Sequence, residues 1–234
     1  MSTAILVDAA FFLKRVKAIY PEKDHNSAEV IAQLLHRYCC LHLKQGKHRK
    51  KLYRIFVYDC PPINLTLQHP VSGKQINFSN TPVSKFRKNF HEELKKKRMV
   101  ALRLGHIQES KDWKTSPKIL KEIISRKRKI EDLTEADVFP DFRQKGVDIK
   151  IGIDISSLAY KKLADQIILI SGDSDFVPAA KLARREGIDF VLDPLWNPIS
   201  PSLFEHIDGL ESKCRKPAPK KVIPKSPKSL KVAC

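Results

Sequence analysis

Short apolar runs alternate with helical stretches along the chain. Apolar residues that recur at intervals of three and four predict helices after the first run to about residue 17, and at 27–43, 84–98, 147–162 and 174–186. Ser27 is placed to cap the second helix, and Gly187 to close the last one. Continuous apolar or β-branched runs predict buried strands at residues 4–8, 52–58, 99–107, 166–170 and 188–192.

Two stretches have little periodicity. Residues 61 to about 80 are rich in turn residues, and 111–140 is charged and expected to be irregular or part-helical. Strands that alternate with helices predict an α/β fold, with a parallel sheet and helices on both faces. In such a sheet the ligand crevice lies beyond the carboxyl ends of the strands, so residues just after each strand are the candidates for chemistry.

Length and charge narrow the class of protein. The 234 residues, 42% of them hydrophobic, suffice for one compact domain with extensions. Lys and Arg number 44 against 26 Asp and Glu, a net charge of +18. Such an excess attracts polyanions, so nucleic acid is the expected partner, with a merely solvated basic surface as the alternative.

The C-terminal segment separates from the rest by composition. Residues 211–234 hold eight Lys or Arg, four Pro and one acid, which predicts a flexible Lys/Pro-rich tail. Residues 1–210, the expected domain, keep 36 basic and 25 acidic residues. The body is therefore basic without the tail.

Membrane and secretory signals are missing from the pattern. No apolar run approaches the roughly 18 residues of a membrane span, and the first residues carry Asp8 inside their apolar stretch without a basic leader. We therefore expect a soluble, cytoplasmic protein. Its five cysteines form no CxxC pair, which argues against a disulfide framework and a structural zinc site.

Acidic residues follow several of the predicted strands. Asp8 ends the first run, Asp59 ends the second, and Asp173 and Asp175 follow 166–170 in the sequence SGDSDF. Singly, each has an ordinary interpretation as a turn or cap residue. Carboxylates gathered on one edge need a cation to share them, and hard oxygen ligands suit Mg²⁺ or Mn²⁺. On a basic protein this favours a metal site that activates water for attack on a phosphodiester.

The predicted helix 147–162 supplies two more acids. Asp154 completes the set if this helix packs beside the same edge. Asp148 lies six residues earlier, about 120° away around an ideal helix, so both cannot point the same way. Asp154 is therefore the predicted ligand, and Asp148 an N-terminal cap or supporting acid.

Four motifs point to one known family: VDAAFF at 7–12, VYDCPP at 57–62, QKGVDIKIGIDI at 144–155 and LISGDSDFVPAAKLARREGIDFVL at 169–192. With these motifs the chain resembles the NYN domain proteins, the LabA-like branch of the PIN-like ribonuclease superfamily. The resemblance spans about residues 3–210 and is weak at about 63–140, which it marks as a variable basic insertion. It implies a Rossmann-like PIN fold and a metal-dependent ribonuclease.

The resemblance also assigns roles to residues. Many family members carry Asp-Gly-x-Asn after the first strand, whereas Ala9, Ala10 and Phe11 follow Asp8 here, so a polar group for substrate positioning is lost. Metal binding and catalysis fall to Asp8, Asp154, Asp173 and Asp175, with Asp148, Ser171 and Asp59 in support.

Three basic clusters are candidates for binding a nucleic-acid strand, with solvated surface as the alternative for each. Phe86, Phe90 and Trp113 lie near them and are candidates for base stacking, although core packing is the safer interpretation of the two Phe. The clusters contain Lys50, Lys51, Lys95, Lys96, Lys97, Arg98, Arg126, Lys127, Arg128 and Lys129.

The sequence thus predicts a metal-dependent endoribonuclease that hydrolyses phosphodiester bonds, with single-stranded RNA as the favoured substrate and Mg²⁺ or Mn²⁺ as cofactor. Two alternatives stay open. One is a catalytically weak, regulatory module that binds nucleic acid, and the other is a protein-interaction component that docks through its tail.

Overall fold

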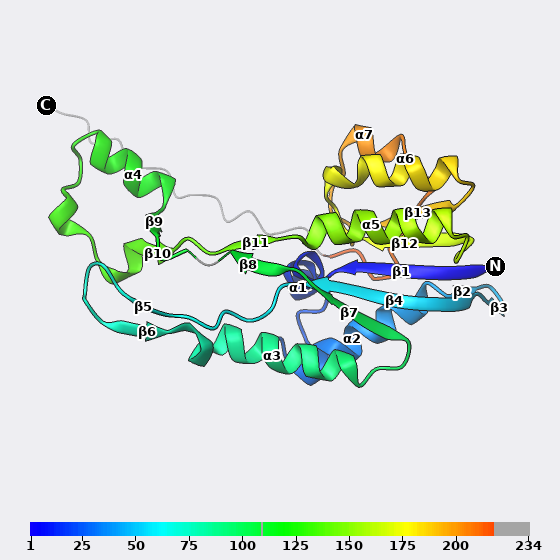
Figure 1. Cartoon of the computed structure of the whole chain (residues 1–234), viewed down its shortest axis with the longest axis horizontal. Coiled ribbons are helices and arrows are strands. Elements are labelled where there is room, and N and C mark those ends of the chain that lie inside the picture. Colours follow the sequence, from blue (N-terminus) through cyan, green and yellow to red (C-terminus); the bar gives the residue numbers. More distant parts are fainter. Residues whose placement is uncertain (109, 218–234) are drawn as a thin grey trace, which may run out of the picture.

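The centre of the molecule is a six-stranded sheet. The structure is a computed structural model that describes residues 1–108 and 110–217. The strand order is β14-β13-β12-β1-β4-β7, and all neighbouring strands run parallel (Figure 1). The strands are β1 (Ser2–Asp8), β4 (Lys51–Asp59), β7 (Val100–Leu104), β12 (Gln166–Ile170), β13 (Asp189–Asp193) and β14 (Gly209–Leu210). The predicted α/β fold with a parallel sheet is confirmed.

Helices cover both faces of this sheet. Alternate residues of β1 serve the two cores: Ile5 and Val7 pack on one side, and Ala4 and Leu6 on the other, all fully buried. The first face carries α1 (Ala9–Ile19), α2 (Ala28–Leu41) and α3 (Pro82–Lys95), and the second carries α5 (Val147–Tyr160), α6 (Val177–Arg185) and α7 (Pro201–Phe204) (Figure 1).

Local capping explains where these helices begin. Ser27 caps α2, because its Oγ accepts a hydrogen bond from Val30 N at 3.3 Å, as predicted. The helix predicted at 174–186 is divided: a 3₁₀ turn, η4 (Ser174–Phe176), precedes α6, and Asp173 caps this turn. Gly146 precedes α5 with a φ of 79°, a left-handed conformation that favours glycine.

An arm extends from the carboxyl edge of the sheet, at the left of Figure 1. It consists of residues 61–81, 105–108 and 110–146. Its two-stranded ribbons pair β5 (Thr66–Gln68) with β6 (Gln75–Asn77), β8 (His106–Gln108) with β11 (Arg143–Lys145), and β9 (Trp113–Thr115) with β10 (Val138–Pro140). The arm also holds α4 (Pro117–Ile124) and the 3₁₀ turns η1 (Phe78–Asn80), η2 (Ile130–Asp132) and η3 (Glu135–Asp137).

The structure differs from the expected single insertion at 63–140. Residues 82–104 lie inside that range, yet they form α3, which packs on α2, and β7, which pairs with β4. This segment is therefore part of the central layers, and two separate excursions flank it. At the opposite edge, β2 (Lys44–Gln45) and β3 (His48–Arg49) form a small hairpin.

Residues 211–217 run along the body and are called the strap here. Cys214 is buried, and Trp196 donates its Nε1–H to the Cys214 carbonyl at 2.9 Å. Lys213 N donates to the Tyr38 hydroxyl at 3.1 Å. The strap is thus packed, although the sequence places it at the start of a flexible tail, and the rest of that tail, 218–234, lies outside the described residues. No helix in the described residues is long and apolar enough to cross a membrane.

Candidate active site

Four acids meet at the carboxyl edge of the sheet. Asp8 ends β1, Asp148 stands in the first turn of α5, and Asp173 and Asp175 lie in the turn after β12. Asp8 and Asp173 line a cleft of about 470 Å³. Within residues 1–108 and 110–217, none of the four forms a salt bridge. None of these carboxylates is therefore paired with a cationic side chain in that part of the chain.

Two of these carboxylates also accept hydrogen bonds from nearby backbone N–H groups. The Asp8 carboxylate accepts a hydrogen bond from Phe11 N at 3.1 Å and caps α1. Asp173 Oδ1 accepts one from Asp175 N at 3.0 Å and caps η4. The capping that the sequence offered as an ordinary interpretation is present, and it orients these side chains at the edge.

The electrostatics of the site oppose ionisation. Burial raises the pKa of Asp8 from 3.8 to about 6, Asp148 and Asp59 add to the rise, and hydrogen bonds from Phe11 N and Ala10 N oppose it. Burial also raises the pKa of Asp148, and the charges of Asp173 and Asp175 contribute. A cation among these carboxylates would relieve the repulsion.

The acids do not form a ready-made multidentate cage. Among the described residues, no group of three or more His, Cys, Asp or Glu side chains is placed to hold a metal ion. Mg²⁺, however, keeps several waters and is commonly bound through one or two carboxylates together with substrate phosphates. The hard carboxylate oxygens of Asp8, Asp148, Asp173 and Asp175, which form no salt bridge among the described residues, fit that mode of binding.

Asp154 lies elsewhere, which corrects its predicted place in the group. It is buried, and its carboxylate accepts hydrogen bonds from Arg103 Nε at 2.9 Å and from the Tyr58 hydroxyl at 2.8 Å. Ile151 and Ile155 fix the rotation of α5 by packing in the core. Six residues of helix also place Asp154 about 9 Å along the axis from Asp148. Asp148 therefore joins the acids, and Asp154 ties α5 to β4 and β7.

Asp59 also differs from the four acids, because cationic and hydrogen-bonding partners surround its carboxylate. Arg87 of α3 donates to its Oδ1, and His91 Nε2 lies 2.8 Å from its Oδ2. Cys60 N donates to Oδ1 at 2.8 Å. Because the side chain is fully buried among these partners, Asp59 anchors α3 to the end of β4.

Comparison with known proteins gives the family. The NYN domain family matches residues 71–198, more than half of the chain. The chain belongs to the NYN domain family. This family is part of the PIN-like nuclease superfamily and is generally dependent on divalent metals, so the predicted PIN-like fold class is confirmed and the implied substrate is a nucleic acid.

A solved structure is also similar to this NYN protein: a protein of unknown function from Vibrio parahaemolyticus, 16% identical, with a TM-score of 0.44 and coverage of 89% of this chain and 90% of that one. No curated protein matches the chain. The family match includes Asp148, Asp173 and Asp175, and it begins after β1 and Asp8.

The cleft of the NYN domain contains Ser171, which the family resemblance named as a supporting residue, and three polar residues that the sequence interpretation missed. Lys14 and Arg15 of α1 line it together with Ser171 and Asn197. Ser171 is buried beside Asp173, whose N donates to Ser171 Oγ at 3.4 Å. Asn197 thus brings an amide to the cleft from the loop after β13, although the Asn of the family's Asp-Gly-x-Asn motif is missing after Asp8.

A fifth acid at a strand end was also missed. Asp193 ends β13 and is fully buried, with the Tyr38 hydroxyl, Ser212 Oγ at 2.7 Å and Leu195 N at 2.8 Å donating to it. His42 Nε2 lies 2.8 Å from its Oδ2. The rule applied to Asp8 would have found it, because it directly follows the run 188–192. Its partners make it an anchor for α2 and the strap.

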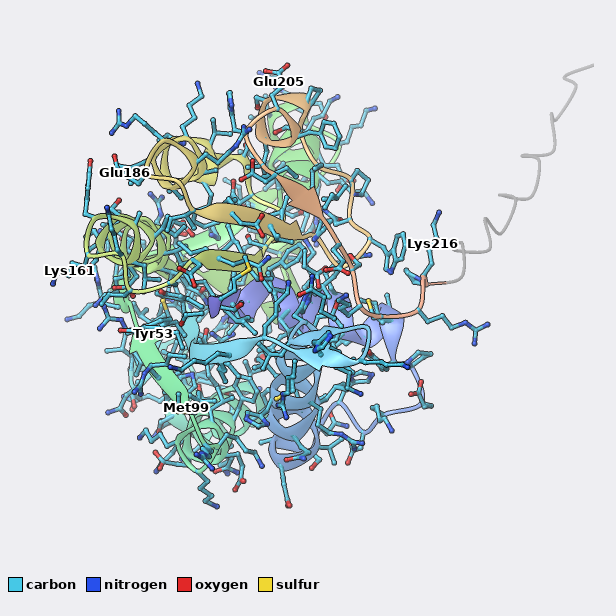
Figure 2. All side chains as sticks on the ribbon, turned by 90° about the vertical axis from the view of Figure 1, so that its right-hand side faces the viewer. Tyr53, Met99, Lys161, Glu186, Glu205 and Lys216 are labelled. Carbon is cyan, nitrogen blue, oxygen red and sulfur yellow. The ribbon has the colours of Figure 1, made fainter. Side chains whose placement is uncertain are left out.

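Two of the three basic clusters lie at the far edge of the sheet from the acids. Lys50 and Lys51 stand at the start of β4, and Lys95 to Arg98 precede β7. Figure 2 looks at this edge, where Met99 is labelled. The cluster of Arg126, Lys127, Arg128 and Lys129 belongs to the arm, on the side of the acids, although Arg128 pairs with Asp137.

The three aromatic candidates for base stacking differ in burial and in position. Phe90 is fully buried, and Phe86 stacks on it with ring centroids 5.9 Å apart. Trp113 lies in the arm, with its ring centroid 4.7 Å from that of His69. Core packing therefore accounts for Phe90, while Phe86 and Trp113 keep part of their surface exposed.

Proposed function

We propose that this NYN protein is a metal-dependent endoribonuclease of the LabA-like branch that cuts single-stranded RNA. The observation that carries the proposal is the set of four acids at the carboxyl edge of a parallel sheet, none of them paired with a cation among the described residues. The raised pKa of Asp8 supports it, because the fold has gathered charges there that repel one another.

Mg²⁺ or Mn²⁺ is the proposed cofactor, bound through one or two of the carboxylates of Asp8, Asp148, Asp173 and Asp175 together with a phosphate of the substrate. When bound, such an ion supplies positive charge that activates water and stabilises the charge developing on the phosphate. The exposed Lys14 would attract the phosphate to the cleft, and the Ser171 hydroxyl would donate a hydrogen bond to one of its oxygens. Arg15 is held in place by Leu195 O, which accepts from its Nη2 at 2.7 Å.

The test is cleavage of internally and end-labelled single-stranded RNA and DNA by the full chain with Mg²⁺, with Mn²⁺ and with EDTA. Asp173→Asn is the test variant, and Asp165→Asn is the matched control because Asp165 is an exposed acid at the opposite edge. We expect internal RNA cuts that need the metal, persist in the control, and fall at least about 100-fold in the variant, a loss typical of removing one charge-stabilising group.

Equal products from the wild type and Asp173→Asn would reject the nuclease and favour the alternative of a catalytically weak binding module. Metal-dependent cuts in DNA alone would retain the metal site but reject the ribonuclease. Metal-dependent cuts only from strand ends would retain the metal site but reject the endonuclease.

A further inference from the structure

A second cleft lies beside α1. It is bounded by α1, the start of α2 and the first half of α3, and is called the α1/α3 groove here. Its volume of about 660 Å³ exceeds that of the acid cleft and falls within the range of roughly 300–1,000 Å³ that is usual for ligand sites. Lys14 lines both clefts, so they meet at this residue.

The groove carries positive charge with no negative charge on its walls. Lys14 and Lys17 come from α1, Lys85 and Arg87 come from α3, and no Asp or Glu of the described residues lines it. The three lysines are exposed and form no salt bridge in the described parts of the chain, whereas Arg87 pairs with Asp59. An anion in the groove would therefore meet three uncompensated charges.

The lysines of the far edge differ in this respect. Lys95 pairs with Glu92 at 2.8 Å, and Lys96 pairs with Glu93 at 2.6 Å. Part of the positive charge of that cluster is thus already neutralised on the surface of α3. The lysines of the groove are free of such pairs in the described residues, and the groove adjoins the acid cleft at Lys14.

Two further features suit a nucleotide. Phe86 lines the groove and is supported from behind by Phe90, so it presents an aromatic ring of fixed orientation. His25 also lines it. Its Nε2 donates to Tyr20 O at 2.9 Å, so in that tautomer Nδ1 is the acceptor, and this atom is buried without a partner in the described residues. A base amino group or a ribose hydroxyl would supply the missing donor.

We propose that the α1/α3 groove binds the substrate strand next to the point of cleavage, with its lysines on the phosphates and one unpaired nucleotide in the cavity. This rests on the proposed function, because it assigns the groove to the same substrate. Stacking on Phe86 needs a base whose face is free, which a single strand offers and a duplex does not, so the groove selects single strands.

The test is binding of a fluorescent single-stranded RNA to the full chain in EDTA, measured by anisotropy across a series of salt concentrations. The variant is Lys17→Glu with Lys85→Glu, one change on each wall. The control is Lys161→Glu with Lys181→Glu, an equal change of charge at exposed residues of the α5 and α6 face. Figure 2 shows Lys161 on that distant part of the surface.

We expect the groove variant to raise the Kd at least about 10-fold and to lower the slope of log K against log salt by about 1.4, the value for two lost phosphate contacts on a single strand. The control should change the Kd less than about 2-fold. Lys17→Gln with Lys85→Gln repeats the test with a smaller change, and thermal melting establishes that each variant is folded.

Equal weakening by the groove and control variants would overturn the proposal, as would a duplex bound as tightly as the single strand. Failure of the groove and failure of the nuclease are distinguishable. Normal RNA binding by the groove variant, with cleavage by the wild type, rejects the groove alone. Loss of binding by that variant, with no cleavage by the wild type, retains the groove and rejects the nuclease.

Discussion

Among single residues, Asp8 has three roles. It ends β1, it caps α1, and it is one of the four acids at the carboxyl edge. Its pKa is raised from 3.8 to about 6, so the folded protein binds its proton more tightly than the unfolded chain does. The free energy of unfolding therefore falls as the pH rises from about 4 to about 6, and the loss persists at higher pH. Two pKa units correspond to at most about 3 kcal/mol.

Asp8→Asn tests this linkage, because Asn keeps the cap and removes the charge. We expect the variant to be more stable than the wild type by about 1–3 kcal/mol at pH 8 and equal to it at pH 3.5, in urea melts with EDTA. The same difference at both pH values would show that charge is not the cause. Mg²⁺ should narrow the difference at pH 8, since the ion would offset the repulsion in the wild type alone.

Asp154 and Asp173 make a contrasting pair of residues. Asp154 is buried against Arg103, whose side chain is 45% exposed, so solvent weakens the pair and we expect Asp154→Asn to cost about 2 kcal/mol of stability. The fraction that stays folded should still cleave RNA. Asp173 is exposed, so Asp173→Asn should lose activity with little change in stability. Thermal melts and cleavage rates on the same preparations compare the two variants. Loss of specific activity in folded Asp154→Asn would contradict this assignment and show that Asp154 takes part in the active site.

Among the elements, the position of α5 depends on the first residues of the arm after β7. Gly105 stands between β7 and β8, where an added Cβ would lie 2.5 Å from Lys145 O and 3.0 Å from Val147 Cγ2. The absence of a side chain therefore lets the β8–β11 ribbon reach the start of α5. That start carries Asp148 to the other acids.

Gly105→Ala should cost about 1–3 kcal/mol and reduce cleavage, because the backbone at Lys145 and the first turn of α5 must shift. Gly152→Ala is the control within the same helix. Nothing lies within 4 Å of its added Cβ, so the substitution should stabilise the protein by roughly 0.5–1 kcal/mol. Chemical denaturation of both variants measures this, and equal effects would contradict the close approach at Gly105.

At the scale of the whole molecule, the direction of the strands assigns each charge cluster to an edge. All six strands of the central sheet are parallel, so the acids and the start of the arm lie at one edge, and the α1/α3 groove joins this edge at Lys14. The proposed RNA strand would meet all three there. The clusters that begin β4 and precede β7 are separated from them by the length of the sheet.

This arrangement predicts unequal effects of neutralising two lysines. Lys96→Gln with Lys97→Gln, at the far edge, should leave the Kd for single-stranded RNA within about 2-fold at 0.1 M salt. Lys127→Gln with Lys129→Gln, in the arm, should raise the Kd several-fold because phosphate contacts are lost. Anisotropy titrations measure both. A larger loss in the first variant would place the strand across the far edge.

The sequence by itself determined the sheet and the acids at its strand ends, since apolar runs and helical periodicity are local properties of the chain. Asp8, Asp173 and Asp175 could therefore be found by spacing alone. The family resemblance added the PIN-like fold, which the 71–198 match supports.

Only the tertiary structure decided which acids remain unpaired. Asp59 and Asp193 end strands as Asp8 does, but Arg87 and His91 of α3 surround the first, and Tyr38 of α2 and His42, the C-cap of that helix, surround the second. The exchange of Asp154 for Asp148 likewise follows from the rotation of α5, which core packing fixes. The physical reason is that the pairing and burial of a charge depend on neighbours that are distant in the chain, and no local pattern of residues encodes them.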